Sequence, residues 1–155
     1  MTMSHPTPDT PLRLRRRTSR QSAALLGALG DVFTTREDGP RLSRQLGEAL
    51  AAACPRPAGS DVAALEAAIN EALADMDLGV ARLLPQDDAL VIEVAEYPAV
   101  NPSPRQPEVV VFGLLEGFLT HYLNTLSGSQ DLSARLASTP AATDAPLRLL
   151  YRKHP

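Results

Sequence analysis

The segment 108–126 constrains the fold of this chain most, because it is apolar around most of a helical circumference. Its apolar positions are Val109, Val110, Val111, Phe112, Leu114, Leu115, Phe118, Leu119, Tyr122, Leu123 and Leu126. A helix with this pattern has to be covered on more than one face. It would be about 28 Å long at ~1.5 Å per residue, which is enough to cross a small domain. We therefore predict a long central helix against which the remaining elements pack.

Two glycines lie on one face of this predicted helix. Gly113 and Gly117 are four residues apart, and the missing side chains allow another backbone to approach closely. In a membrane this spacing is typical of helix dimers. No run in the chain approaches the ~20 apolar residues that span a bilayer, so we expect no membrane span. We interpret the two glycines as a site of tight packing onto a helix or a sheet, within the chain or in an oligomer.

Two polar residues of the same segment are candidates for a function. Glu116 interrupts the apolar pattern, and a buried carboxyl must be paired, hydrogen-bonded or protonated. Its alternatives are a contact with a neighbouring loop, an ion pair at an interface, or contact with a ligand. His121 has no carboxylate or second histidine three or four residues away, as a metal pair on a helix would require. We interpret it as a partly exposed or interface histidine.

Helical spacing of apolar residues predicts three amphipathic helices before residue 77, at 19–33, 40–53 and 60–76. Pro40 suits the first turn of the second helix. Ser60 can cap the third helix, with an aspartate in the first turn. The apolar stripe of the second helix is Leu42, Leu46, Ala49, Leu50 and Ala53, and the predicted exposed residues of the third are Glu66, Glu71 and Asp75.

The spacing of apolar residues then changes from about 3.6 to 2, which indicates strands. Residues 78–84 and 89–96 predict one hairpin around the turn 85–88. After the central helix, 131–137 and 146–153 predict a second hairpin. The expected fold is α+β, with N-terminal helices and a long central helix packed against a four-stranded antiparallel sheet made of the two hairpins.

We assign residues 19–153 to a single domain of this fold, preceded by a flexible basic arm at 1–18. Three prolines deny the arm a continuous helix. Four arginines of the arm are candidates for binding an acidic partner, nucleic acid or anionic lipid: Arg13, Arg15, Arg16 and Arg17. The alternative is an arm that is only solvated. The arm has no interleaved aromatics, so base stacking is not expected. Four prolines predict that 97–107 is an exposed loop outside the sheet.

Charge and the start of the chain bear on partners and location. The chain carries a net charge of −3, but residues 1–20 hold five arginines against one aspartate, so residues 21–155 hold −7. Nothing in the folded part therefore attracts nucleic acid. The apolar run 23–29 contains Gly27 and suits an amphipathic helix better than the core of a signal peptide. We expect no signal peptide and a cytoplasmic protein, with a periplasmic location less favoured.

Little in the sequence indicates catalysis. One cysteine excludes an intramolecular disulfide and a cysteine-rich metal site. Cys54 lacks the local signature of a nucleophile, and Asp87 and Asp88 fall in a predicted turn, where aspartate is common. No glycine motif for phosphate binding occurs. We predict that the chain is not an enzyme, with no catalytic residue, cofactor or metal site, and that its surplus apolar helix surface contacts other subunits.

Two blocks of sequence resemble the family of the bacterial cellulose synthase D subunit (BcsD). One runs from Leu65 to Leu83, with LEAAIN and MDLGVARL at its ends, and the other is FGLLEGFL at 112–119, followed by a closing strand LRLLYR at 147–152. The resemblance covers about residues 20–153. The core also resembles the vinyl-reductase/TRAPP-like domains, in which a hairpin, a long Leu-Glu-Gly helix and a final two-stranded piece recur in this order. Members of that group often carry cysteines near the helix, where this chain has none.

The resemblance to the BcsD family implies a non-catalytic accessory subunit of a bacterial cellulose synthase and secretion complex. It implies homo-oligomers in which dimers assemble to an octamer, other synthase subunits and a proline-rich scaffold protein as partners, and weak contact with nascent glucan at most. Three tyrosines and no tryptophan agree with guiding glucan rather than gripping it. The alternative is a vinyl-reductase-like small-molecule-sensing or adaptor domain, which needs a closed apolar pocket of at least ~300 Å³ between the long helix and the sheet.

Overall fold

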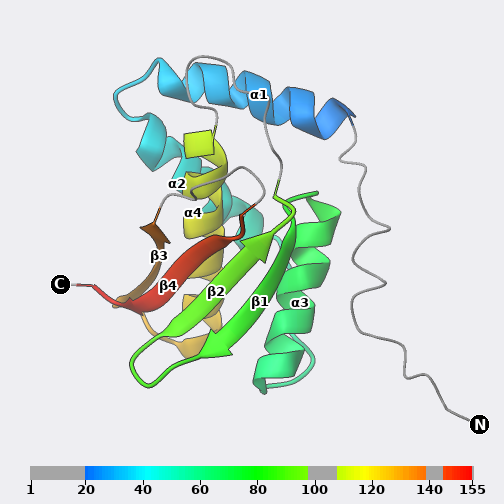
Figure 1. The fold of residues 1–155 in the computed structure, drawn as a ribbon, viewed down its shortest axis with the longest axis vertical. Coiled ribbons are helices and arrows are strands. Elements are labelled where there is room, and N and C mark those ends of the chain that lie inside the picture. The colour runs from blue at the N-terminus through cyan, green and yellow to red at the C-terminus, as the bar shows by residue number, and fades with distance from the viewer. Residues whose placement is uncertain (1–19, 98–107, 139–144, 155) are drawn as a thin grey trace, which may run out of the picture.

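The structure, a computed structural model, describes residues 20–97, 108–138 and 145–154 and confirms the α+β fold. The predicted arm at 1–18, and the predicted loop beyond Tyr97, lie outside the described residues. The elements in chain order are α1 (Arg20–Thr34), α2 (Gly39–Ala52), α3 (Val62–Asp75), β1 (Val80–Pro85), β2 (Leu90–Ala95), α4 (Glu108–Ser127), β3 (Leu132–Ser138) and β4 (Leu147–Lys153) (Figure 1).

Both predicted hairpins form, and they join into a single antiparallel sheet. The strand order is β1-β2-β4-β3, so the second strand of each hairpin lies inside the sheet and the first strand lies at its edge. The two hairpins meet where Ile92 pairs with Leu149 and Val94 pairs with Leu147. The pairing of β3 with β4 is irregular between Leu136 and Ser138. The edge strands are therefore β1 and β3.

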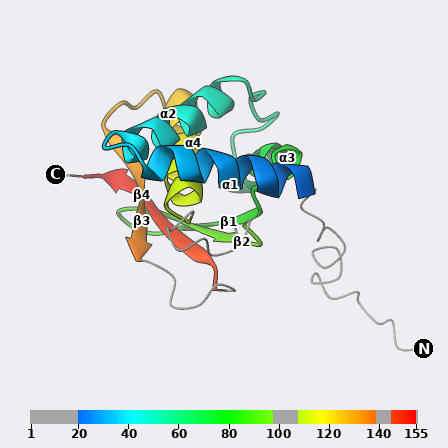
Figure 2. The ribbon, with the colours of Figure 1, turned by 90° about the horizontal axis from the view of Figure 1, so that it is seen from above.

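The predicted long helix, α4, lies between the sheet and α2. Figure 2 shows α2, α4 and α1 on one side of the sheet, with α4 closest to the strands. Leu115, Phe118 and Leu119 of α4 are completely buried and belong to the same core as the inward residues of the sheet. The cover on two sides explains why α4 is apolar around most of its circumference. Because α2 of the same chain supplies the second cover, this pattern does not by itself require another subunit.

The start of α3 and the end of α4 follow local capping chemistry, with one correction to the prediction. The prediction that Ser60 caps the third helix is wrong, because the cap is Asp61, whose carboxylate accepts a hydrogen bond of 2.7 Å from the backbone N–H of Ala64. Pro40 lies in the first turn of α2 as predicted. At the end of α4, Gly128 has a φ of 69° and donates its N–H to the carbonyl of Asn124 at 2.9 Å.

The first strand begins two residues later than predicted. Leu78 still belongs to the turn that follows α3, because its N–H donates to the carbonyl of Leu73 at 2.8 Å. Gly79 has a φ of 108°, and a side chain there would overlap with the carbonyl oxygen of Ala95. Glycine tolerates both constraints, so the chain turns at Gly79 and pairs from Val80 onward.

Candidate functional site

The glycines of α4 lie against the backbone of α2. A Cβ atom on Gly117 would overlap with the carbonyl oxygen of Arg44, and one on Gly113 would overlap with the hydroxyl of Ser43. The contact is reciprocal, because a Cβ atom on Gly47 of α2 would overlap with the carbonyl oxygen of Leu114. The structure thus uses both predicted glycines within one chain.

The side of α2 that makes this contact is not the predicted apolar stripe. Its buried residues are Gly39, Ser43, Gly47 and Ala51, whereas Ala49 and Ala53 of the predicted stripe are exposed. The four buried residues are small and spaced by four, as are Gly113 and Gly117 on α4. That matching period was the signal in the sequence for a close helix pair, and a search for large apolar residues missed it.

Glu116 joins three elements of the chain. One carboxylate oxygen, Oε2, lies 3.0 Å from Nε of Arg44 on α2 and 3.9 Å from Nη1 of Arg135 on β3. The other, Oε1, accepts a hydrogen bond of 2.9 Å from the N–H of Leu136. The side chain is only 13% exposed. Both oxygens of this carboxyl group thus have partners within the chain, as a largely buried carboxyl group requires.

Two further side chains of α4 continue this contact along the outer edge of β3. Thr120 accepts a hydrogen bond of 2.9 Å from the N–H of Ala134, and Asn124 donates one of 3.0 Å to the carbonyl of Leu132. The two side chains and Glu116 are spaced by four along the helix, about 6 Å. Their partners are spaced by two along the strand, about 6.6 Å. The similar spacing lets successive helix turns bond alternate strand residues.

The outer edge of β1 is bonded in the same way by α3. Glu66 accepts a hydrogen bond of 2.7 Å from the N–H of Leu83. Asn70 accepts one of 2.6 Å from the N–H of Ala81 and donates one of 2.9 Å to its carbonyl. The prediction that Glu66 is exposed is therefore wrong, because a polar residue beside an edge strand replaces a missing strand partner. Helix side chains bond both edges of the sheet.

The other candidate residues lie apart from one another. Cys54 lies just after the end of α2, and its thiol donates a hydrogen bond of 3.3 Å to the carbonyl of Leu50. Burial, followed by the charge of Asp75, raises the pKa of that thiol. A raised pKa disfavours the thiolate that nucleophilic attack requires. Asp87 and Asp88 are exposed in the turn between β1 and β2, and His121 is half-buried on α4.

Two observations on the described part of the chain concern groups of metal-ligating side chains and the hydropathy of its helices. Within the ranges that the structure describes, no three His, Cys, Asp or Glu side chains are placed to hold a metal ion. None of the described helices has the length and hydropathy needed to cross a membrane.

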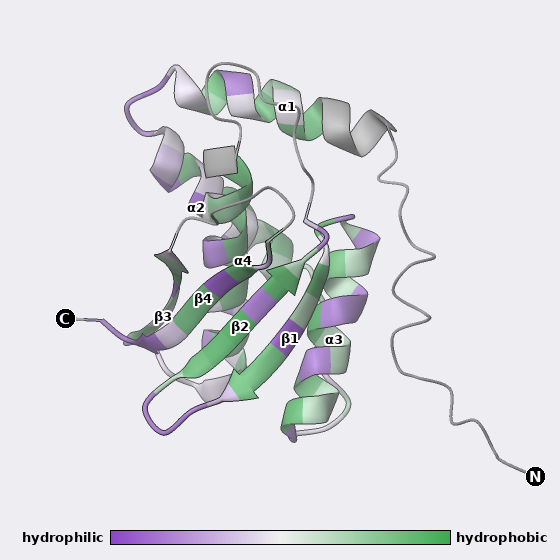
Figure 3. Cartoon of the chain, viewed as in Figure 1, coloured by the Kyte–Doolittle hydropathy of each residue, from purple (hydrophilic) through white to green (hydrophobic). Residues whose placement is uncertain are grey.

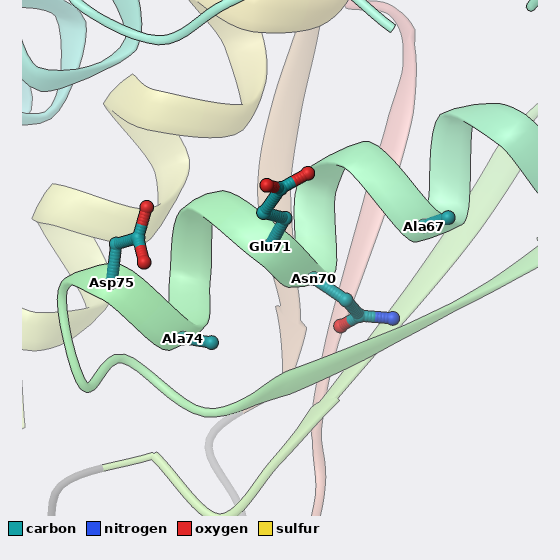
Figure 4. Close-up of a pocket in the computed structure, with 5 residues that line it drawn as sticks. All are labelled: Ala67, Asn70, Glu71, Ala74 and Asp75. Carbon is teal, nitrogen blue, oxygen red and sulfur yellow. The ribbon is translucent and has the colours of Figure 1, made fainter. Parts of the chain in front are cut away.

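A surface hollow runs along α3 (Figure 4). It is lined by Ala67, Asn70, Glu71, Ala74 and Asp75. In the close-up Asn70 points toward β1, while Glu71 and Asp75 point to the other side of the helix. The hollow is open and carries two carboxylates, so it differs from the closed apolar pocket that a small-molecule-sensing domain requires.

The fold and these contacts define a class of protein: a small α+β domain whose polar helix side chains bond the edges of its own sheet. The chain matches the family described as the D subunit of cellulose synthase over residues 15–150, and it belongs to that family. The chain is thus a subunit related to cellulose synthesis, as the sequence resemblance implied. A comparison with curated proteins gives no match.

Proposed function

We propose that this chain is a non-catalytic, oligomeric scaffold subunit of a bacterial cellulose synthase and secretion complex. In this role it arranges synthase complexes so that glucan chains emerge in order, while glycosyl transfer belongs to another subunit. The family supports the link to cellulose synthesis. The observation that supports a non-catalytic role is that polar side chains of the helices form hydrogen bonds to the edge strands of the sheet.

Glu116 illustrates this use most clearly. A general acid or base has to reach a substrate proton within hydrogen-bond distance. Both oxygens of Glu116 are instead held inside the chain, by Arg44 at 3.0 Å and by the N–H of Leu136 at 2.9 Å. Glu66 is held by β1 in a comparable way. The carboxylates that lie closest to the core thus support the fold.

An apolar stripe on the outer side of α1 supports the oligomeric part. Leu25 is 63% exposed and Val32 is 55% exposed, and the exposed Ala28 lies between them. The three residues are spaced by three and four, so they share one face of the helix. Apolar side chains aligned on a surface helix are typical of protein–protein contacts. We assign this stripe to contact between copies of the chain.

The remaining parts of the proposal concern partners and location. We place the oligomer in the cytoplasm beside an inner-membrane synthase complex, in contact with other synthase subunits and with a proline-rich scaffold protein. Contact with nascent glucan is weak in this proposal, because a moving chain cannot be held tightly. An octamer made of dimers is the expected assembly.

A genetic complementation experiment tests the function. Deletion of the gene in a cellulose-producing bacterium is expected to lower cellulose yield and disorder the fibres, while glucosyl transfer by isolated membranes persists. Glu116→Gln should restore yield and order, because it keeps an acceptor for Leu136. Leu25→Asp with Val32→Asp should not restore them. Unchanged cellulose after deletion, or glucosyl transfer that disappears with Glu116→Gln, would contradict the proposal.

A further inference from the structure

The face of the sheet that points away from α4 carries more basic than acidic side chains. Strand pairing places Arg82, Glu93 and Arg148 side by side in one row of this face. Arg152 lies on the same face of β4, four residues from Arg148. Arg135 of β3 is not counted with them, because its guanidinium lies 3.9 Å from Glu116 of α4. Three exposed arginines accompany one partly exposed glutamate in a chain whose net charge is −3. We call this surface the arginine face.

The arginine face also has an apolar row. Leu84 pairs with Val91 and Val91 pairs with Leu150, so the three side chains lie in line across three strands. Leu84 and Leu150 are partly exposed, whereas Val91 between them is buried. In Figure 3 hydrophilic bands cross neighbouring strands between hydrophobic stretches, and Figure 2 shows the helices gathered on the opposite side of the sheet. No element within the described ranges covers the arginine face.

The outer side of α3 is complementary to the arginine face in charge and similar to it in length. The helix contains no basic residue, and Glu71 and Asp75 are exposed four residues apart. The small side chain of Ala67 lies one turn before Glu71 on the same side, and these residues line the surface hollow shown in Figure 4. A helix of 14 residues is about 21 Å long, and a strand of 6 to 7 residues is about 20–23 Å long. Helix and sheet therefore match in length.

The bonded edges of the sheet restrict how copies can join. Strand addition needs an edge with unpaired N–H and C=O groups. Side chains of α3 already bond Ala81 and Leu83 of β1, and side chains of α4 bond Ala134 and Leu136 of β3. A second copy is thus expected to use faces of the molecule rather than edges of its sheet.

We propose that the arginine face of one copy docks the outer side of α3 of a second copy, with Glu71 and Asp75 among the arginines. The inference rests on the homo-oligomer of the proposed function and names a contact within it. Because the two surfaces differ, each copy offers one of each, and the contact propagates into a ring or an open chain. The apolar stripe of α1, which can pair with itself, supplies the second contact that dimers in a larger assembly need.

Two charge-reversed variants test this contact. The sheet variant is Arg82→Glu with Arg152→Glu, which leaves the Glu93–Arg148 and Glu116–Arg135 contacts in place. The helix variant is Glu71→Arg with Asp75→Arg. The control is Arg56→Glu, an exposed residue between α2 and α3. Masses of the full-length proteins are measured by light scattering after size exclusion, and circular dichroism checks that each variant is folded.

The proposal predicts that each variant alone falls to the mass of two copies or fewer, while the control keeps the native mass. An equimolar mixture of the two variants should recover the larger assembly, because each reversed surface then faces its opposite charge. A variant that does not fold is replaced by its Gln counterpart, which should weaken assembly in the same direction.

The contrary results separate the two proposals. A native protein that is a monomer overturns the oligomeric function itself. A native oligomer whose mass neither variant changes overturns only this contact. Loss of assembly in the helix variant alone also overturns it, since the arginines at 13–17 would then be the partners of α3. Failure of the folded mixture to recover contradicts the pairing of these two surfaces.

Discussion

At the scale of single residues, small side chains decide how closely α2 and α4 approach. Gly113 and Gly117 were visible in the sequence as a pair spaced by four, and the spacing predicted a close contact. Their partner could not be read from the pattern, because Ser43 and Gly47 lie between large apolar residues that suggested a different buried side of α2. Close backbone contact depends on the absence of a side chain, and hydropathy does not measure side-chain size.

Gly117→Ala is expected to destabilise the protein by ~1–3 kcal/mol, because its Cβ atom would overlap with the carbonyl of Arg44 and force α2 and α4 apart. Urea unfolding at a fixed protein concentration measures the change. The matched control is Gly128→Asn, at a left-handed position with no atom within 4 Å, which should cost less than ~1 kcal/mol. Equal stability of Gly117→Ala and the native protein would show that the helices do not touch at Gly117.

Glu116 is the second residue whose role can be measured. Glu116→Ala should lower the free energy of unfolding by ~2–3 kcal/mol, since it leaves the N–H of Leu136 without its acceptor and Arg44 without its carboxylate. Glu116→Gln keeps a neutral acceptor and should cost about 1 kcal/mol. Thermal unfolding of the three proteins at the same concentration gives the order. A Gln variant as unstable as the Ala variant would mean that the ion pair, and not the bond to Leu136, dominates.

At the scale of elements, most of the fold could be predicted, and the edges of the sheet could not. Changes of period from 3.6 to 2 located the helices and both hairpins, with ends that differ from the structure by one or two residues. The order of strands depends on how the hairpins dock, which no local pattern encodes. Without that order, Glu66, Asn70 and Thr120 could not be recognised as partners of edge strands.

The double variant Glu66→Ala with Asn70→Ala tests the bonded edge. It removes three hydrogen bonds to β1, so the protein should lose ~2–3 kcal/mol of stability. The freed edge should also pair between molecules, which raises light scattering on incubation. Glu48→Ala, at an exposed position of α2, is the control. A double variant that matches the control in stability and scattering would show that these side chains do not protect β1.

At the scale of the whole molecule, the structure changes the reason for expecting an oligomer. The apolar circumference of α4 suggested a surplus of helix surface, but α2 and the sheet cover it within one chain. Among the described residues, the surfaces that we propose for contact with other copies are the stripe of Leu25 and Val32 on α1 and the arginine face of the sheet. Neither could be assigned from periodicity, because an amphipathic pattern does not show which apolar side chains a fold leaves uncovered.

Sedimentation equilibrium of the purified full-length chain, from low to high micromolar concentration, tests the central claim most directly. An oligomeric scaffold should show a mass that is an even multiple of 16.6 kDa, with eight copies as the expected assembly. Leu25→Asp with Val32→Asp should lower that mass while circular dichroism stays unchanged. A single species of 16.6 kDa at every concentration would contradict the account.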